Sequence, residues 1–211
     1  RAAVLARLGA LVETLAVTAD ERVVETVRAL LDSPRAALRR EAALCAGHLQ
    51  DAASAPRLLE LLAQGERGER DAALWALRRI STLGFTADPR PWRLWLDEEH
   101  AWWRTRAAAC LEELNHPRTE VALAALDEVA RRRLHRDVLA AAVVDMGGVA
   151  GELALRRCHV LRALASRAGL GFLRECLGQS DADLRRAAEQ AWRASTELPP
   201  PIAVDRTSRP N

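Results

Sequence analysis

The sequence predicts an all-α fold, a right-handed α-solenoid of stacked antiparallel helix pairs, and three observations support this. First, an Arg-x-x-Ala pattern recurs inside apolar helical stretches, at Arg39, Arg70, Arg104 and Arg185. These arginines are 31, 34 and 81 residues apart, and the first two spacings match the period of helical repeats. Second, apolar residues recur three and four positions apart, as in amphipathic helices. Third, the 211 residues are 49% hydrophobic but only 4% aromatic, and the abundant small residues suit close helix packing.

Helical periodicity and turn residues predict five helices in the first part of the chain. Thr18 or Asp20 is expected to cap the second helix, and Gly65 and Gly68 are expected to interrupt the chain before the fifth. The five helices are predicted over residues 2–16, 20–32, 35–49, 55–63 and 69–82.

An irregular insert at residues 83–91 precedes the second part of the chain. Asp88 is expected to cap the next helix, with Pro89 as its first residue, and this helix carries Trp92 and Trp95. The sequence predicts a separate helix for Trp102 and Trp103, which runs to about residue 114. The remaining helices are predicted over residues 117–132, 134–146, 151–166, 169–177 and 182–195.

Two of the Arg-x-x-Ala segments share a short polar lead-in, which predicts a turn followed by a capped helix. Before the first, Ser33 is expected to be the N-cap, with Pro34 as the first helical residue. Before the last, Ser180 is expected to cap, with Asp183 in the first turn.

A first helix, an Asp-containing turn and a second helix that opens with aliphatic-Arg-x-x-Ala resemble the HEAT repeat family. The resemblance covers most of residues 20–195 and is most specific at residues 32–49 and 177–192, whereas residues 132–165 depart from the pattern. It implies five to six helix pairs in one HEAT-like domain over residues 1–196. The composition of residues 197–211, which is Pro-rich and polar, predicts a disordered tail.

The resemblance also implies a structural role for the repeated arginines. In HEAT-like arrays the corresponding arginines form ladders with acidic residues of neighbouring turns, and Asp32, Asp71 and Asp181 are the candidate partners here.

Composition argues against several classes of function. The 31 Lys and Arg residues nearly balance 29 Asp and Glu residues, whereas a dedicated nucleic-acid binder usually has a basic excess. No apolar run is long enough to span a bilayer. None of the four cysteines forms a C-x-x-C pair, and they lie in predicted helices, which favours reduced thiols and a cytoplasmic location.

The sequence contains no pattern typical of a catalytic, metal or cofactor site. The five histidines lack metal-ligand spacing, and neither a Gly-rich phosphate loop nor a nucleophile elbow occurs. The basic run Arg131–Arg133 is interpreted as a helix end, where cations complement the helix dipole. We therefore expect neither an enzyme nor a bound cofactor or metal.

Two groups of residues are candidates for binding a partner. One is a row of arginines that could line the groove formed by the second helices, with guanidinium forks suited to carboxylates or phosphates. The other is a tryptophan cluster, which is interpreted either as packing around the insert or as an exposed anchor. The candidates are Arg40, Arg106, Arg157, Arg186, Trp92, Trp95, Trp102 and Trp103.

The sequence thus favours a non-catalytic, monomeric scaffold that binds another protein in a concave groove or at the Trp-rich insert. The tryptophan string is similar to one that recurs in bacterial HEAT-like proteins. Two alternatives stay open on resemblance: an enzyme similar to the HEAT-like DNA glycosylases, and a lyase or chaperone-type subunit that acts on a cofactor-bearing protein.

Overall fold

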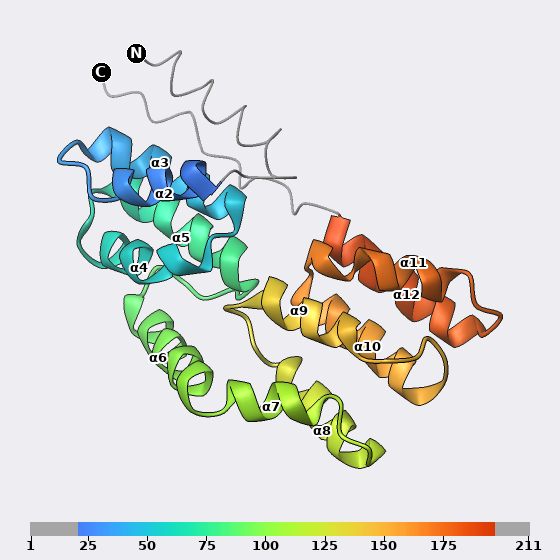
Figure 1. The fold of residues 1–211 in the computed structure, drawn as a ribbon. Coiled ribbons are helices and arrows are strands. Elements are labelled where there is room, and N and C mark those ends of the chain that lie inside the picture. The colour runs from blue at the N-terminus through green and yellow to red at the C-terminus, as the bar shows by residue number, and fades with distance from the viewer. Residues whose placement is uncertain (1–20, 197–211) are drawn as a thin grey trace. The chain divides into compact units, whose positions relative to one another are not determined.

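The computed structural model describes residues 21–196, which form eleven α-helices and two 3₁₀ helices and contain no β-strand. The predicted all-α class is confirmed. The predicted helix at 2–16 and the tail at 197–211 lie outside the described residues. The chain divides into two compact units, unit 1 up to Thr105 and unit 2 from Arg106 (Figure 1). Each unit is a solenoid-like stack of helices, and a single repeat domain over residues 1–196 stays a prediction.

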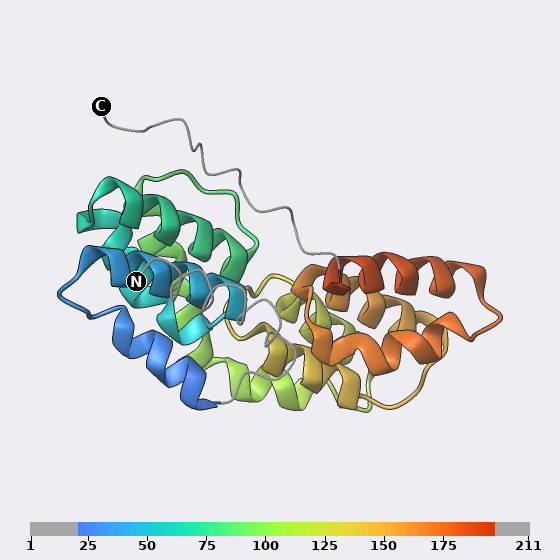
Figure 2. The same cartoon turned by 90° about the horizontal axis from the view of Figure 1, so that it is seen from above.

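The described part of unit 1, residues 21–105, consists of two helix pairs and one longer helix. Helices α2 and α3 form the first pair and α4 and α5 the second, and α3 lies beside α5 (Figures 1 and 2). Helix α6 packs on α4. The elements are α2 (Glu21–Leu30), α3 (Ala36–Leu49), η1 (Ala52–Ser54), α4 (Ala55–Gln64), α5 (Arg67–Ser81) and α6 (Pro89–Thr105).

Residues 106–196 of unit 2 form three helix pairs, α7 with α8, α9 with α10, and α11 with α12. The second helices α8, α10 and α12 pack on one another in that order, as α3 and α5 do in unit 1. The elements are α7 (Ala107–Glu113), α8 (Thr119–Val129), α9 (Arg136–Asp145), α10 (Gly151–Leu164), η2 (Arg167–Gly169), α11 (Leu170–Leu177) and α12 (Ala182–Thr196).

Small residues allow α3 and α5 to approach closely. Ala43 and Ala46 on α3 and Ala73 and Ala76 on α5 are fully buried. A Cβ atom at Gly47 would lie only 2.8 Å from the Cα atom of Ala76, so the two backbones nearly touch. The alanine-rich composition therefore reflects short distances between helix axes as well as helix propensity.

Polar contacts connect neighbouring second helices between residues about 30 positions apart. Arg39 on α3 binds Glu69 on α5, 30 residues further on, and Arg162 on α10 binds Gln190 on α12, 28 residues further on. Arg70, at the position of the second Arg-x-x-Ala segment, is exposed.

The first and last Arg-x-x-Ala segments make the same contact. Arg39 donates to the carbonyl of Ser33 at 2.7 Å, and Arg185 donates to the carbonyl of Gln179 at 2.8 Å. In both cases the arginine binds the backbone six residues earlier, at the turn that enters its helix. The two segments therefore resemble each other in structure as well as in sequence, because the arginine makes the same backbone contact in both.

Three predicted helix boundaries need correction. The tryptophans of the insert lie on one continuous helix, α6, which ends before Arg106. Gly68 lies in the first turn of α5, which begins at Arg67, so it does not break the chain. Glu66 and Glu69 form a capping box there, and this box starts the helix ahead of the glycine.

Of the predicted N-caps, Thr18 and Asp20 lie outside the described residues. Of the other three, one is confirmed and two are wrong. Asp88 accepts a hydrogen bond from the backbone N–H of Arg90 at 3.0 Å, and α6 begins at Pro89 as predicted. Arg35 occupies the N-cap of α3 instead of Ser33. At α12, Asp181 accepts the N–H groups of Asp183 and Leu184, because its carboxylate is one residue closer to the helix than Ser180.

Candidate functional site

Most of the predicted tryptophan patch belongs to the core of unit 1. Trp92, Trp95 and Trp102 are 0%, 9% and 8% exposed. The Trp92 indole donates to the carbonyl of Thr86 at 2.8 Å, and its ring lies 5.9 Å from that of Trp95. The packing interpretation therefore holds for these three rings, and the interpretation as exposed anchors is wrong for them. Trp103 is half-buried.

Arg157 also needs correction, because it lies in the core of unit 2 and not on a groove. It is 1% exposed, and its guanidinium stacks on the ring of Phe172 at 3.8 Å. It donates to backbone carbonyls at the end of α9 and in the following turn. The acceptors are Val143 (2.9 Å), Val144 (2.9 Å), Gly147 (3.2 Å) and Gly148. This fork stabilises the C-terminal end of a helix, where carbonyls lack partners and the dipole favours a cation.

The other three candidate arginines are exposed or half-exposed. Arg106 binds Glu113 at 2.5 Å and Glu128 at 3.0 Å, and these hydrogen bonds raise the pKa of Arg106 and lower that of Glu113. Arg186 forms an exposed pair with Asp183 at 3.2 Å. Arg40 is exposed and has no polar partner among residues 21–196. Arg40 thus offers the least engaged guanidinium of the predicted row.

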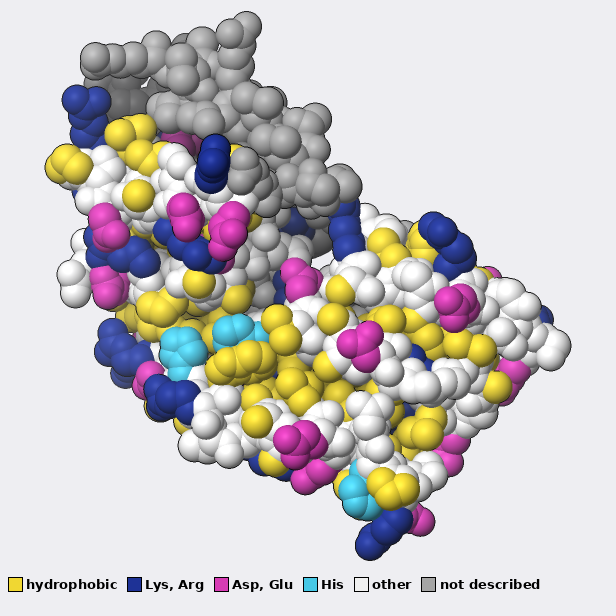
Figure 3. Space-filling model, in the orientation of Figure 1, with side chains coloured by type: hydrophobic (Ala, Val, Ile, Leu, Met, Phe, Trp, Pro, Cys, Tyr) yellow, Lys and Arg dark blue, Asp and Glu magenta, His cyan; other side chains and the backbone are white. Residues whose placement is uncertain are grey.

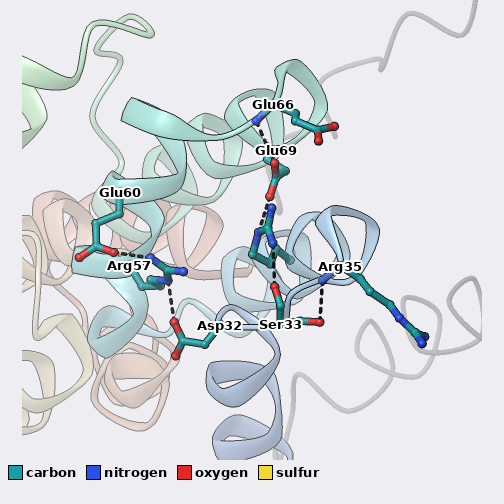
Figure 4. Close-up of polar contacts among 8 residues, drawn as sticks. Asp32, Ser33, Arg35, Arg57, Glu60, Glu66 and Glu69 are labelled. Atoms are coloured by element: carbon teal, nitrogen blue, oxygen red, sulfur yellow. Dashed lines mark hydrogen bonds and ion pairs between the residues drawn. The ribbon is translucent and has the colours of Figure 1, made fainter.

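The predicted ladder exists at Arg39, but its partner is Glu69 and not Asp32. The Arg39 Nε atom lies 2.6 Å from Glu69, whose other oxygen accepts the N–H of Glu66 at 2.8 Å (Figure 4). Burial alone would raise the pKa of Glu69, but these hydrogen bonds outweigh it and lower the pKa. Asp32 instead pairs with Arg57 at 2.8 Å.

An aromatic pair that the sequence analysis did not select joins α3 to α5. The imidazole of His48 and the indole of Trp75 have ring centroids 4.8 Å apart, and both side chains are half-buried. The guanidinium of Arg79 lies 5.8 Å from the same indole, and burial lowers the pKa of Arg79. Trp75 is thus held by neighbours on both helices while part of its ring stays open to solvent.

Helical spacing places further side chains on the solvent side of this pair. Arg40, Leu44 and His48 follow one another at four-residue steps on α3, and Asp71 precedes Trp75 by four residues on α5. Arg40 lies beside the first turn of α5, where a Cβ at Gly68 would be 3.5 Å from its Cδ atom. We call this surface the α3–α5 face, defined by Arg40, Leu44, His48, Asp71 and Trp75.

Sequence reasoning missed Trp75 because it stands alone in an Ala- and Leu-rich helix, whereas four of the other five tryptophans cluster. The available signal was its position four residues after the exposed Asp71. Arg156 was also not selected as a candidate. It occupies the surface position next to the buried Arg157 and pairs with Asp127 at 3.0 Å.

Opposite charges are mixed on the face of unit 1 that Figure 3 shows. In the view of Figure 3, basic and acidic side chains of α2–α5 alternate and no large area of one sign is visible. Among the described residues no group of three His, Cys, Asp or Glu is arranged to hold a metal ion. In the same part of the chain no helix is long and apolar enough to cross a membrane.

Comparison with known proteins gives a family for the N-terminal part of the chain. A family model described as HEAT repeats matches residues 6–78, a segment whose described part extends from α2 into α5. Residues 6–78 therefore match HEAT repeats, in line with the predicted resemblance, and the predicted all-α fold class is confirmed.

The other comparisons add little. Among solved structures, the chain is similar to an engineered protein determined by crystallography in a structural genomics programme. The two are 16% identical, the match covers 90% of this chain and 87% of that chain, and the TM-score is 0.37. A likeness this weak carries no argument about function. The search of curated proteins found no match.

Proposed function

We propose that the chain is a non-catalytic protein–protein interaction scaffold and that its partner binds the α3–α5 face of unit 1. The observation that carries this proposal is Trp75, an indole fixed by His48 and Arg79 but partly open to solvent. Large aromatic side chains that are held in place before binding lose little conformational freedom, and Trp is enriched among residues that dominate interface energies.

The polar residues of the face complement this anchor. Arg40 presents a planar fork of donors that matches a carboxylate, and Asp71 presents an acceptor on the neighbouring helix. Since neither has a polar partner within the described residues, binding there would not break an internal ion pair. An apolar centre bordered by polar groups is the usual composition of a protein interface.

The family supports the same class of function. Stacked helical repeats present extended surfaces formed by successive second helices, and α3 and α5 are such helices in the segment that matches HEAT repeats. The remaining parts of the proposal are a monomeric state and a cytoplasmic location. The four described cysteines are free and buried, which supports a reducing compartment.

Capture of partners from a lysate of the source organism tests this function. The complete chain is immobilised, one half of the lysate is treated with nuclease, and bound proteins are identified by mass spectrometry. The proposal expects a partner that survives nuclease treatment and whose yield falls at least about tenfold with Trp75→Ala or Arg40→Glu, the effect of roughly 1.4 kcal/mol.

Two variants serve as matched controls. Trp192→Ala removes another half-buried indole, on α12 in unit 2, and Arg93→Glu reverses another exposed arginine, on α6. Both should leave the yield unchanged. Loss of every partner after nuclease treatment would contradict a protein-binding function and favour nucleic acid. Equal losses in all four variants would contradict the α3–α5 face as the binding surface.

A further inference from the structure

We draw no further inference here: the strongest candidate, the exposed apolar stripe of Val138, Ala141 and Ala142 along α9 in unit 2, carries nothing because no feature of the described residues shows what covers it.

Discussion

At the scale of single residues, the same residue type serves opposite purposes in this chain. Arg157 is 1% exposed and stabilises a helix end, whereas Arg156 beside it forms a half-exposed ion pair. Trp92 is fully buried, whereas Trp75 is only half-buried. Composition cannot separate these roles, because each depends on the direction in which the helix presents the side chain.

Even a substitution that keeps the positive charge of Arg157 should destabilise unit 2. Arg157→Lys places one ammonium where a planar group now satisfies four carbonyls, so buried acceptors lose partners. We expect a loss of about 2–4 kcal/mol in the free energy of unfolding of unit 2. Urea denaturation, together with hydrogen exchange of the α9–α10 segment, measures it.

Arg156→Lys is the matched control, because its pair with Asp127 is exposed to solvent and contributes less than about 1 kcal/mol. If both variants unfolded at the same urea concentration, the proposed role of Arg157 would be wrong.

Trp102 provides a second test at the residue scale. Because it is 8% exposed, Trp102→Ala should lower the free energy of unfolding by about 3–5 kcal/mol through lost burial and a residual cavity. Leu94, which is 67% exposed on the same helix, should tolerate alanine with a change below about 0.5 kcal/mol. Chemical denaturation followed by circular dichroism gives both values, and a negligible change at Trp102 would contradict its assignment to the core.

At the scale of elements, the contact between α3 and α5 depends on residues without large side chains. A methyl group at Gly47 would lie 2.5 Å from the Trp75 ring and 2.8 Å from the Ala76 backbone, and the backbone cannot yield as a flexible side chain can. Gly47→Ala should therefore destabilise unit 1 by about 1–3 kcal/mol, which thermal denaturation can measure.

Gly68→Ala is the control for this effect. Its methyl group would meet Arg40 at an ordinary 3.5 Å in the first turn of α5, so the helix preference of alanine should leave stability equal or raise it by up to about 1 kcal/mol. A Gly47→Ala variant as stable as Gly68→Ala would show that the helices can separate without cost.

Acid should weaken the links between elements of unit 1. The Glu69 side chain is 2% exposed beside Arg39, and the Asp51 side chain is 7% exposed beside Arg28. Burial acts to raise both pKa values, but the hydrogen bonds from the arginines prevail and the pKa values are lowered on folding. The stability from these groups is therefore complete above the unfolded pKa values, which are about 4, and is lost as the pH falls through the folded values.

The unfolding free energy should thus decline as the pH falls below about 5, and Glu69→Gln should make that decline shallower. Denaturation in urea at several pH values measures this, with Glu60→Gln as an exposed control on α4. An unchanged slope for Glu69→Gln would indicate that the buried pair contributes nothing to the acid sensitivity.

The sequence predicted the elements well and their ends less well. Amphipathic periodicity located α2–α5 and α8–α12, because that periodicity is the same property that makes the helices pack. It did not separate α7 from the helix that carries Trp102 and Trp103. It missed the capping box at Glu66 and Glu69, which lets α5 include Gly68. It also divided α6 between its tryptophans, whereas α6 is continuous from Pro89 to Thr105.

The partners of side chains were harder to predict than the elements. The resemblance to HEAT repeats implied that Arg39 binds an acidic residue, but several acidic residues of neighbouring turns were candidates. Stacking of α5 on α3 selects Glu69, 30 residues away. The Trp75–His48 contact likewise depends on the register of two helices, and one helix considered alone does not reveal it.

At the scale of the whole molecule, the polar residues divide into two sets. Buried or half-buried ones such as Arg39, Glu69 and Arg157 connect helices within each unit. Exposed ones such as Arg40 and Asp71 remain available to other molecules. This division is expected of a repeat protein, because each repeat must bind its neighbours before it can present a surface to a partner.

The most direct test of the central claim places a photo-reactive benzophenone amino acid at one exposed position at a time in the complete chain. Position 71 lies on the α3–α5 face, whereas positions 94 and 138 lie on exposed sides of α6 and α9. After irradiation in nuclease-treated lysate, we expect one protein to be cross-linked from position 71 and not from the other two. Cross-linking from position 94 or 138 but not from position 71 would contradict the assignment of the partner to the α3–α5 face.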